Sequence, residues 1–382
     1  MPAMLPAPAD PARRLAGVLP SVIASLAGTA DAPIGLGRAR SAVVALVDGL
    51  GAWNLGARRG HARTLAGAMG KKDVVRTTFP STTAAAIASF ATGAAPGAHG
   101  LVGYRTLVPG RDVLANQLNG WEQGLLPDGW QRRPTQFEAA RAAGLSPFTV
   151  GAPRYANSGY TEAVLRGSDY RPASSIEERF DLAREIVDGV DGALVYLYVP
   201  ELDQLAHAHG WESDRWVAAL ERVDGAVAGL VARMPQSAGL LVTADHGVVD
   251  VPAHRHVFID RPELIDGVRH VAGEPRCLAL YFEPGLAASD RAALVQRWRD
   301  AEGERAWVAT REEAVTAGLY GQVDDEVLPR IGDLIVAARS GIAYYDPREP
   351  DRGAERMIGQ HGSLTDEESR VPLIRFGGYE TR

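Results

Sequence analysis

The chain has 382 residues, of which 46% are hydrophobic and 23% are charged, and its formal net charge is -7. This length and composition suffice for a large buried core, and the absence of clustered Lys and Arg argues against a nucleic-acid surface. Cys277 is the only cysteine, so an intramolecular disulfide is excluded and a reducing cytoplasm fits. The sequence contains no run of 18 or more apolar residues, so no membrane-spanning helix is predicted.

The N-terminal 40 residues show two overlapping patterns. Arg13-Arg14, followed by the mostly apolar segment 15–28, is typical of a signal peptide for export. The apolar side chains of this segment also recur at the spacing of an amphipathic helix, and Pro20 and Ser25 interrupt what would be the hydrophobic region. We favour the second interpretation, and we predict that residues 1–40 hold a helix packed on the core of a cytoplasmic protein.

Three apolar runs are predicted to be buried strands, each followed by polar side chains. Their residues are 41–47, 192–199 and 239–243. Asp48 follows the first run, Asp203 and His207 follow the second, and Asp245 and His246 follow the third. In an open α/β sheet, ligands bind outside the carboxyl ends of the strands, so these side chains are candidate ligands. For Asp48 and for the turn at Asp245, an ordinary helix cap or capped turn is the alternative interpretation.

Asp203 and His207 are four residues apart, so in a helix they share one face and can hold one ion between them. A pair of this kind can also serve only as a cap and a solvated charge. Its position after a buried strand favours a ligand pair. His209 points in another direction on such a helix, and we interpret it as a neighbour of the site.

Ser81, Thr82 and Thr83 lie at the start of a helix predicted over residues 84–92. A hydroxyl at this position is the preferred cap of a helix. The free amides and the dipole of the same helix end also bind phosphate, and a metal ion can turn a hydroxyl there into a nucleophile. The residues themselves leave both interpretations open.

A glycine-rich loop, residues 96–103, contains His99, which we interpret as a structural histidine rather than a ligand. Tyr104 and Arg105 follow this loop directly. We regard both as candidates to face the substrate, because loops at strand ends carry binding residues more often than the strands themselves.

The segments after this loop alternate between helix and strand patterns. Helices are predicted over 135–143, 175–190 and 214–234, and a further strand over 146–150. Such alternation is typical of an α/β layer. We therefore predict an α/β fold with a mostly parallel central sheet and helices on both of its faces.

The pattern loosens after residue 250 and resumes after residue 330. In between, the predicted elements are a strand at 277–282 and helices at 289–301 and 311–317. Strand patterns follow at 331–338 and 341–345, before a polar, flexible loop, 352–360, that ends at His361. We predict a catalytic core of residues 41–250 and 331–382, with a smaller α+β lobe inserted at 251–330.

Four segments supply six candidate ligands, which are Asp48, Asp203, His207, Asp245, His246 and His361. Imidazole and carboxylate ligands without thiolate suit zinc, or manganese or iron, and disfavour a magnesium or calcium site made of oxygens alone. Two divalent ions bring four positive charges and three aspartates remove three, which leaves one for a phosphate or an ionised threonine. Two ions about 4 Å apart can clamp the entering and leaving oxygens of a displacement at phosphorus.

Six short motifs occur in order between about Val43 and Gly362. They are Asp48-Gly49, Phe79-Pro80-Ser81-Thr82-Thr83, His99-Gly100, Asp203-x-x-x-His207-x-x-Gly210, Asp245-His246-Gly247 and His361-Gly362. In this combination and order the chain resembles the alkaline phosphatase superfamily, and within it the nucleotide pyrophosphatase/phosphodiesterase branch. The resemblance implies the alkaline phosphatase-like form of the predicted fold.

The resemblance also implies a two-zinc site with a covalent mechanism. One zinc ion would be held by Asp203, His207 and His361, and the other by Asp48, Asp245 and His246. Thr83 would bridge to the second ion and attack phosphorus, and water would hydrolyse the resulting phospho- or nucleotidyl-threonine. Thr83 is chosen because the family's nucleophile lies four residues after the Phe of Phe-Pro, and a register error of one would select Thr82 instead.

The chain departs from the family's pattern at Tyr104, where phosphodiesterases of this branch usually carry an asparagine that donates a hydrogen bond to a phosphate oxygen. The Tyr104 hydroxyl or Arg105 are candidate replacements. We predict hydrolysis of phosphodiester or nucleotide pyrophosphate bonds in a small phosphorylated substrate such as a nucleotide. One alternative is a hydrolase of phosphomonoesters or phosphonates.

A further alternative belongs to another class of protein, an inactive metal-dependent nucleotide-binding or regulatory protein. Such a protein would be expected to have lost a ligand or the nucleophile. All seven matching positions are occupied in this chain, which favours an enzyme.

Overall fold

The longest apolar runs of the sequence form the centre of a seven-stranded sheet. They become strands β1 (Ser41–Val47), β7 (Ala193–Val199) and β8 (Ala238–Thr243). Their residues are almost all buried, because these runs carry apolar side chains on both faces of the sheet. This computed structural model describes residues 5–6, 10, 13–29 and 32–380.

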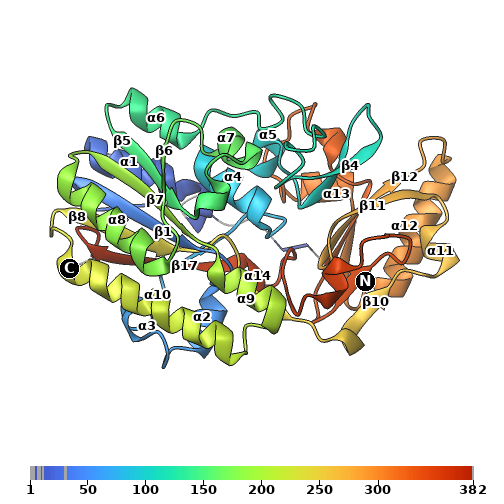
Figure 1. Ribbon diagram of the computed structural model, residues 1–382. Helices are drawn as coiled ribbons and strands as arrows, with labels where there is room; N and C mark the ends of the chain where they lie inside the picture. Colours follow the sequence, from blue (N-terminus) through green and yellow to red (C-terminus); the bar gives the residue numbers. More distant parts are fainter. Residues whose placement is uncertain (1–4, 7–9, 11–12, 30–31, 381–382) are drawn as a thin grey trace.

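Four further strands complete the sheet, namely β2 (Val74–Arg76), β5 (Ser146–Gly151), β6 (Asp169–Pro172) and β17 (Arg370–Gly377). The strand order is β2-β17-β8-β1-β7-β5-β6 (Figure 1). The five strands from β8 to β6 are parallel, and β17 runs antiparallel to both of its neighbours. The prediction of a mostly parallel α/β sheet is therefore confirmed, and the sequence did not lead us to expect β2, β6 or β17.

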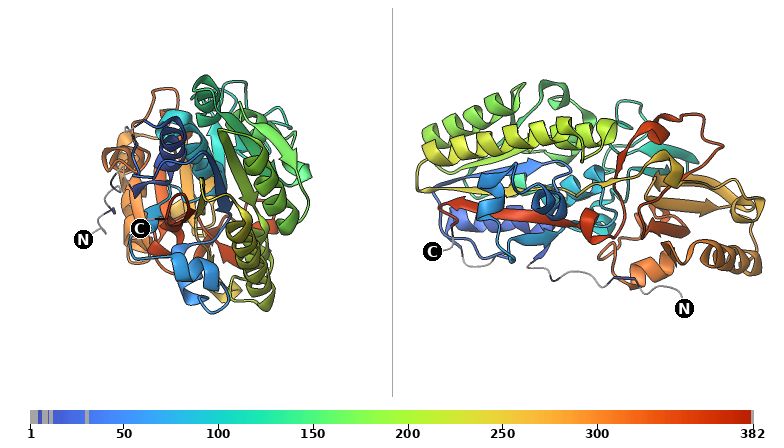
Figure 2. Two further views of the ribbon diagram at one scale, coloured as in Figure 1. Left: turned by 90° about the vertical axis from the view of Figure 1, so that its left-hand side faces the viewer. Right: turned by 90° about the horizontal axis from the view of Figure 1, so that it is seen from below.

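Helices cover both faces of this sheet (Figures 1 and 2). On one face, α8 (Ile176–Gly189) and α10 (Asp214–Arg233) pack together, and α8 contacts β1 and β7. On the other face, α1 (Val18–Ala27) contacts β1, and α6 (Gln136–Ala142) contacts β5. A turn of 3-10 helix at Leu15–Gly17 precedes α1, so the N-terminal segment holds a helix on the core.

A second, four-stranded antiparallel sheet lies toward the right of Figure 1. Its strands, in order, are β11 (Val268–Glu274), β12 (Cys277–Phe282), β14 (Leu334–Ala338) and β13 (Ala306–Thr310). Helix α12 (Ala288–Glu302) packs against this sheet, with Leu294 and Trp298 fully buried between them. Cys277 is buried, as expected for a thiol in an apolar run.

The second sheet extends past the predicted end of the lobe at residue 330. The prediction that the strand at 331–338 belongs to the core is wrong, because β14 pairs with β12 and β13. The next strand, β15 (Ala343–Tyr345), pairs in turn with β10 (His256–Phe258). The correction has a simple cause, because an apolar run reveals that it is a strand but not which sheet it joins.

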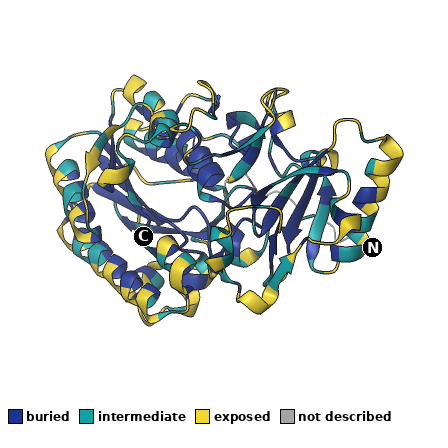
Figure 3. Ribbon diagram, turned by 45° about the vertical axis from the view of Figure 1, so that its right-hand side comes forward, coloured by how far each residue is buried: buried dark blue, intermediate teal, exposed yellow. Residues whose placement is uncertain are grey.

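The remaining helices are α2 (Ala52–Ala57), α3 (Arg63–Ala68), α4 (Thr83–Thr92), α5 (Pro96–His99), α7 (Gly159–Val164), α9 (Glu201–His209), α11 (Pro262–Ile265), α13 (Arg311–Thr316) and α14 (Asp366–Ser369). The remaining strands are β3 (Arg105–Val108), β4 (Val113–Asn116), β9 (Val249–Asp250) and β16 (Gly359–Gln360). Burial follows the two sheets, while exposed residues lie on loops and outer helix faces (Figure 3). Within the described residues, no helix combines the length and apolar character needed to cross a bilayer.

A buried ion pair connects the second sheet to helix α14, which directly precedes strand β17 of the seven-stranded sheet. Arg276, in the turn between β11 and β12, contacts Glu368 of α14 through two hydrogen bonds of 2.7 Å. Both side chains are almost completely shielded from solvent. Because Glu368 also accepts a hydrogen bond from the N–H of Ser363, the pair fixes the segment that follows His361.

Candidate active site

The register of the central strands brings two predicted aspartates to one level. Leu46 of β1 pairs with Thr243 of β8, so that Asp48 and Asp245, each two residues further on, leave the sheet together. The N–H of Gly49 donates a hydrogen bond of 3.2 Å to Oδ1 of Asp245. Both aspartates are buried at the carboxyl edge of the parallel strands, where the sequence placed them.

Helix α9 begins immediately after β7 and carries the predicted Asp203 and His207 pair. The helical spacing brings Nε2 of His207 to 3.1 Å from Oδ2 of Asp203. His209 lies away from this pair, and its Nε2 accepts a hydrogen bond from Arg215. The interpretation of His209 as a neighbour agrees with this contact.

His361 comes from a distant part of the chain. It follows β16, which pairs with β9, the strand next after the Asp245-His246 turn. Its imidazole ring stacks on that of His246 with 3.6 Å between ring centroids, and its Nε2 lies 3.8 Å from Oδ1 of Asp203. The preceding loop, predicted to be flexible, contains a 3-10 turn at Gly353–Arg356 in addition to β16.

The three hydroxyls at the start of α4 have different surroundings. Thr83 Oγ1 lies 3.1 Å from Nε2 of His246, inside the cluster of candidate ligands. Ser81 donates its hydrogen bond to the carbonyl of Ser363, and the Thr82 side chain forms no capping hydrogen bond with the described helix. Of the three, Thr83 is therefore the one in contact with a candidate ligand.

Each histidine of the cluster is oriented by a backbone carbonyl. Nδ1 of His207 lies 2.7 Å from the carbonyl oxygen of Gly359. Nδ1 of His246 lies 3.2 Å from the carbonyl oxygen of Gly247. Nδ1 of His361 lies 2.9 Å from the carbonyl oxygen of Ser81. A proton on Nδ1 leaves the lone pair on Nε2, and Nε2 is the atom that faces the aspartates in all three rings. This arrangement is the usual way in which a protein prepares histidine for a metal ion.

The aspartates complete two sets of ligand atoms in which all members lie within 4.8 Å of one another. One set is Asp203, His207 and His361, and the other is Asp48, Asp203 and His246. Asp245 flanks the second set, with its Oδ2 3.5 Å from Nε2 of His246. One buried oxygen of each aspartate lacks a hydrogen-bond partner among the described residues. Unpaired buried carboxylate oxygens are costly, so this donor set fits two divalent cations.

The ionisation of these side chains supports the same conclusion. Burial, reinforced by Asp245 and Asp203, raises the pKa of Asp48 well above its usual value, and burial also raises the pKa of Asp245. Burial opposes ionisation of Asp203 as well, but His207 and the other histidines outweigh it and lower the pKa of Asp203. Burial and the neighbouring His246 lower the pKa of His361. Crowded carboxylates of this kind call for nearby positive charge.

Of two tyrosines that the sequence did not single out, one contacts a candidate ligand and the other contacts the helix that begins at Thr83. Tyr198, the second-last residue of β7, donates a hydrogen bond to Oδ2 of Asp48. The hydroxyl of Tyr160 donates a hydrogen bond of 2.9 Å to the carbonyl of Ala84, in the first turn of α4. A hydroxyl so near the end of a strand was a usable signal for Tyr198, whereas Tyr160 carries no signal in its own segment.

The two residues proposed to face the substrate each contact a carboxyl group from a later part of the chain. Tyr104 is 37% exposed, and its N–H donates a hydrogen bond of 3.0 Å to Oε2 of Glu274. Arg105 forms an ion pair with Glu349. The sequence did not point to Glu274, because it belongs to the second sheet and lies 170 positions from Tyr104 along the chain.

His99 has the structural role that its position in the glycine-rich loop suggested. It is fully buried in the short helix α5, where its Nε2 lies 2.8 Å from Ser89 Oγ and its Nδ1 accepts a hydrogen bond from the N–H of Leu101. Burial and the positive charge of Arg330 lower the pKa of His99 to about 3. A neutral histidine with both nitrogens engaged is not available as a ligand.

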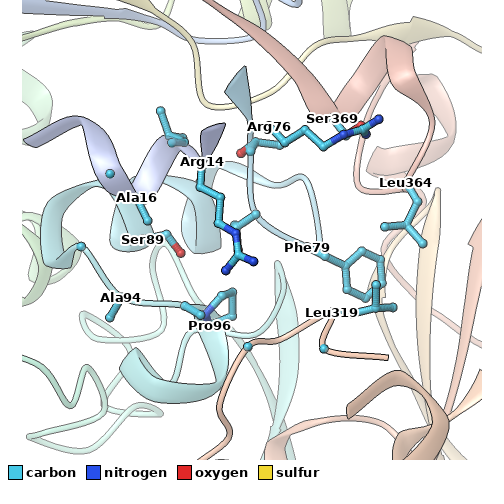
Figure 4. Close-up of a pocket in the computed structure, with 18 of the residues that line it drawn as sticks. Arg14, Ala16, Arg76, Phe79, Ser89, Ala94, Pro96, Leu319, Leu364 and Ser369 are labelled. Carbon is cyan, nitrogen blue, oxygen red and sulfur yellow. The ribbon is translucent and has the colours of Figure 1, made fainter. Parts of the chain in front are cut away.

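A separate cavity of about 260 Å³ lies beside the opposite end of α4 (Figure 4). Ser89 and Pro96 line one side of it, Phe79 and Leu319 line another, and the guanidinium group of Arg14 points inward. None of the candidate ligands is among the described residues that line it. The cavity is therefore distinct from the cluster around Thr83.

Comparisons with known proteins place this site in a family context. The chain matches the model for type I phosphodiesterase / nucleotide pyrophosphatase over residues 42–364. Murine ectonucleotide pyrophosphatase / phosphodiesterase 5 has a similar structure, with 17% identity, a TM-score of 0.68 and coverage of 88% of each chain. Phosphonoacetate hydrolase from Sinorhizobium meliloti 1021, in complex with phosphonoformate, has 19% identity and a TM-score of 0.67, covering 88% of this chain and 90% of that one. No curated protein matches the chain in sequence.

The structural likenesses, at these identities, concern the fold. The family match goes further, because it runs from β1 to just beyond His361 and includes every candidate ligand. The chain therefore belongs to the type I phosphodiesterase / nucleotide pyrophosphatase family of the alkaline phosphatase superfamily, whose members are metal-dependent hydrolases of phosphoric esters and anhydrides.

Proposed function

We propose that the chain hydrolyses phosphodiester or nucleotide pyrophosphate bonds through a covalent intermediate on Thr83. The observation that carries this proposal is the position of Thr83 Oγ1, 3.1 Å from Nε2 of His246 at the first residue of α4. An inactive threonine-to-alanine variant of murine ectonucleotide pyrophosphatase / phosphodiesterase 5 has been solved in complex with AMP. That complex supports both the threonine and a nucleotide as ligand.

Two divalent ions would be held by the buried ligands, and zinc suits these imidazole and carboxylate donors best, with manganese or iron as alternatives. We assign one ion to Asp203, His207 and His361, and the other to Asp48, Asp245, His246 and Thr83. The inward-facing Nε2 atoms and the unpartnered carboxylate oxygens support this assignment. When bound, the ions supply positive charge that promotes ionisation of the threonine and polarises the phosphoryl group.

The side chain of Thr83 provides the attacking oxygen. Its Oγ1 forms a bond to phosphorus while the bond from phosphorus to the leaving oxygen breaks, and the hydroxyl proton passes to solvent. Water then attacks phosphorus, the bond to Oγ1 breaks and the threonine regains a proton. The first amides of α4 have no acceptor within the helix, so they can bind the non-bridging oxygens throughout, and Tyr160 holds this first turn in place.

Tyr104 and Arg105 are proposed to contact the substrate, where the Tyr104 hydroxyl or the Arg105 side chain would donate to a phosphate oxygen in place of the family's asparagine. Hydrolysis of phosphomonoesters or phosphonates at the same site is a second candidate function. It is favoured by Tyr104, which stands where the diesterases usually carry asparagine, and by the likeness to phosphonoacetate hydrolase.

The test compares turnover of bis(p-nitrophenyl) phosphate and p-nitrophenyl phosphate by zinc-loaded protein, with and without a chelator. We expect chelator-sensitive turnover with preference for the diester, and a loss of about 1000-fold or more in Thr83→Ala without loss of zinc. Thr92→Ala is the matched control, because Thr92 lies on the same helix and its hydroxyl donates to the Ala88 carbonyl, away from the site. Wild-type turnover in Thr83→Ala would refute the proposal, and preference for the monoester would select the second candidate.

A further inference from the structure

A carboxyl group from the second sheet reaches the loops that build the active site. Glu274 is the last residue of β11 and is 6% exposed. Its Oε2 accepts the hydrogen bond from the N–H of Tyr104, and the side chain of Thr82 lies beside the carboxyl. Its Oε1 is buried and has no hydrogen-bond partner in the part of the chain that the structure describes.

The loop that carries His361 packs against the same side chain. Gly362 has a φ of +130°, and a Cβ atom built there would lie 2.3 Å from Cγ and 3.0 Å from Oε1 of Glu274. Only glycine allows this close approach. Segments next to the nucleophile, the candidate substrate contacts and a candidate ligand therefore meet at one carboxyl group.

The turn that presents Glu274 is itself fixed in place. The carbonyl of Pro275 accepts a hydrogen bond of 2.7 Å from the N–H of Tyr344, and Arg276 forms the buried ion pair with Glu368. Glu274 therefore adds to the hydrogen bonds that Gln117 donates to the carbonyls of Gly103 and Tyr104, and it is the acceptor for the N–H of Tyr104.

The charge state of Glu274 follows from its surroundings. Burial raises its pKa to about 8, although the N–H of Tyr104 and the Thr82 hydroxyl act in the opposite direction. Three described titratable groups interact with it electrostatically, and none of them is a cation; they are Cys277, Tyr320 and Glu368. Glutamine is therefore a close mimic of this side chain, since it keeps a neutral oxygen acceptor.

We propose that Glu274 is a positioning residue that anchors the segment Gly103–Arg105 beside the Thr83 segment and thereby sets the affinity of the site for the phosphoryl group of the substrate. The inference rests on the proposed function, in which Tyr104 and Arg105 contact the substrate. Glu274 acts through the backbone of Tyr104 and takes no part in bond making or breaking.

Two variants separate the anchor from a general effect on packing. Glu274→Met has a similar volume but removes the acceptor, and Glu274→Gln retains it. In zinc-loaded protein with bis(p-nitrophenyl) phosphate, Glu274→Met is expected to raise KM about tenfold, as the loss of one hydrogen bond implies, with kcat within about threefold and zinc content unchanged. Glu274→Gln is expected to keep KM within about twofold of the wild type.

Amide hydrogen exchange provides a readout that does not depend on turnover. The Tyr104 amide is expected to exchange about ten times faster in Glu274→Met and at the wild-type rate in Glu274→Gln. Glu283→Ala serves as the control, because Glu283 is exposed on the same lobe and should change neither quantity. If Glu274→Met fails to fold, faster exchange or raised KM in Glu274→Gln would still overturn the proposal, and wild-type values would support it.

Three results would overturn the inference. They are an unchanged KM in folded Glu274→Met, an equal rise in KM in both Glu274 variants, or a rise in KM that is accompanied by loss of zinc. A wild-type protein that turns over neither ester would contradict the proposed function instead. In that case, affinity for inorganic phosphate, measured by calorimetry on zinc-loaded protein, decides on the anchor. Binding weakened about tenfold in Glu274→Met supports it, and unchanged binding overturns it.

Discussion

Replacing Arg276 with methionine is expected to reduce the free energy of unfolding by about 3–5 kcal/mol, the range observed when one partner of a buried ion pair is removed. The structure gives reasons for a value in this range. The Arg276 and Glu368 side chains are 1% and 0% exposed, and two parallel hydrogen bonds of 2.7 Å connect them. Arg276 Nη1 also donates hydrogen bonds to the carbonyls of Ser340 and Ile342. Methionine fills the space of the side chain but leaves the Glu368 charge buried without its partner.

The measurement is urea unfolding monitored by tryptophan fluorescence, with zinc content determined in parallel. The double variant Arg276→Met/Glu368→Gln is expected to recover about 1–2 kcal/mol, because no buried charge remains unpaired. Arg222→Ala is the control, since Arg222 pairs with Glu177 on the surface, where both side chains are about half exposed, and should cost less than about 1 kcal/mol. A loss below about 1 kcal/mol in Arg276→Met, or a double variant less stable than the single one, would refute this reasoning.

Three further predictions concern the pKa of Glu274, the candidate metal ligands and the buried His99. Burial raises the pKa of Glu274 to about 8 in the folded protein, whereas in the unfolded chain its pKa lies near the ordinary value of 4.5. Between pH 4.5 and pH 8 the folded protein therefore keeps a proton that the unfolded chain releases. The free energy of unfolding of the wild type falls by about 1.4 kcal/mol per pH unit over this range. In thermal unfolding, the stability of Glu274→Gln relative to the wild type should therefore increase from pH 5 to pH 8 and then level off. A stability difference that does not change with pH would contradict this prediction. His361→Ala should lower zinc content by at least about tenfold, measured by metal analysis, whereas Thr83→Ala should keep it, and equal loss in both would contradict the ligand assignment. Ser89→Ala should cost about 1–3 kcal/mol in unfolding experiments, because it removes the partner of buried His99, and should leave turnover intact, while a loss of zinc would contradict the structural role.

The central strands and the ligand motifs were predictable because both are local signals. The run Ser41–Val47 appears as β1 with the predicted bounds, and Cys277–Phe282 appears as β12 with the predicted bounds. In a parallel sheet, knowing where a strand ends also fixes where its next side chain lies, which is why Asp48 and Asp245 could be expected to meet. The hydrogen bond to Asp245 from the N–H of Gly49, the residue next to Asp48, agrees with this expectation.

The features that were not predictable depend on pairing between distant segments. Strand β17 contains Pro372 and charged residues, so its apolar pattern is weak, and only its pairing with β8 and β2 reveals it. The sheet to which Leu334–Ala338 belongs is likewise decided by partners far along the chain. Glu274 shows the same limit at the site, since it lies 170 positions from Tyr104, and no motif joins them.

The most direct test of the proposed mechanism is to trap the covalent intermediate on Thr83. Zinc-loaded protein is mixed with bis(p-nitrophenyl) phosphate, quenched in acid within one turnover, and mapped by tandem mass spectrometry over Phe79–Ala85. We predict a p-nitrophenyl phosphoryl group on Thr83, with none in the Thr83→Ala variant. An adduct on Thr82, or an active enzyme in which no adduct accumulates and product forms without a burst, would contradict it.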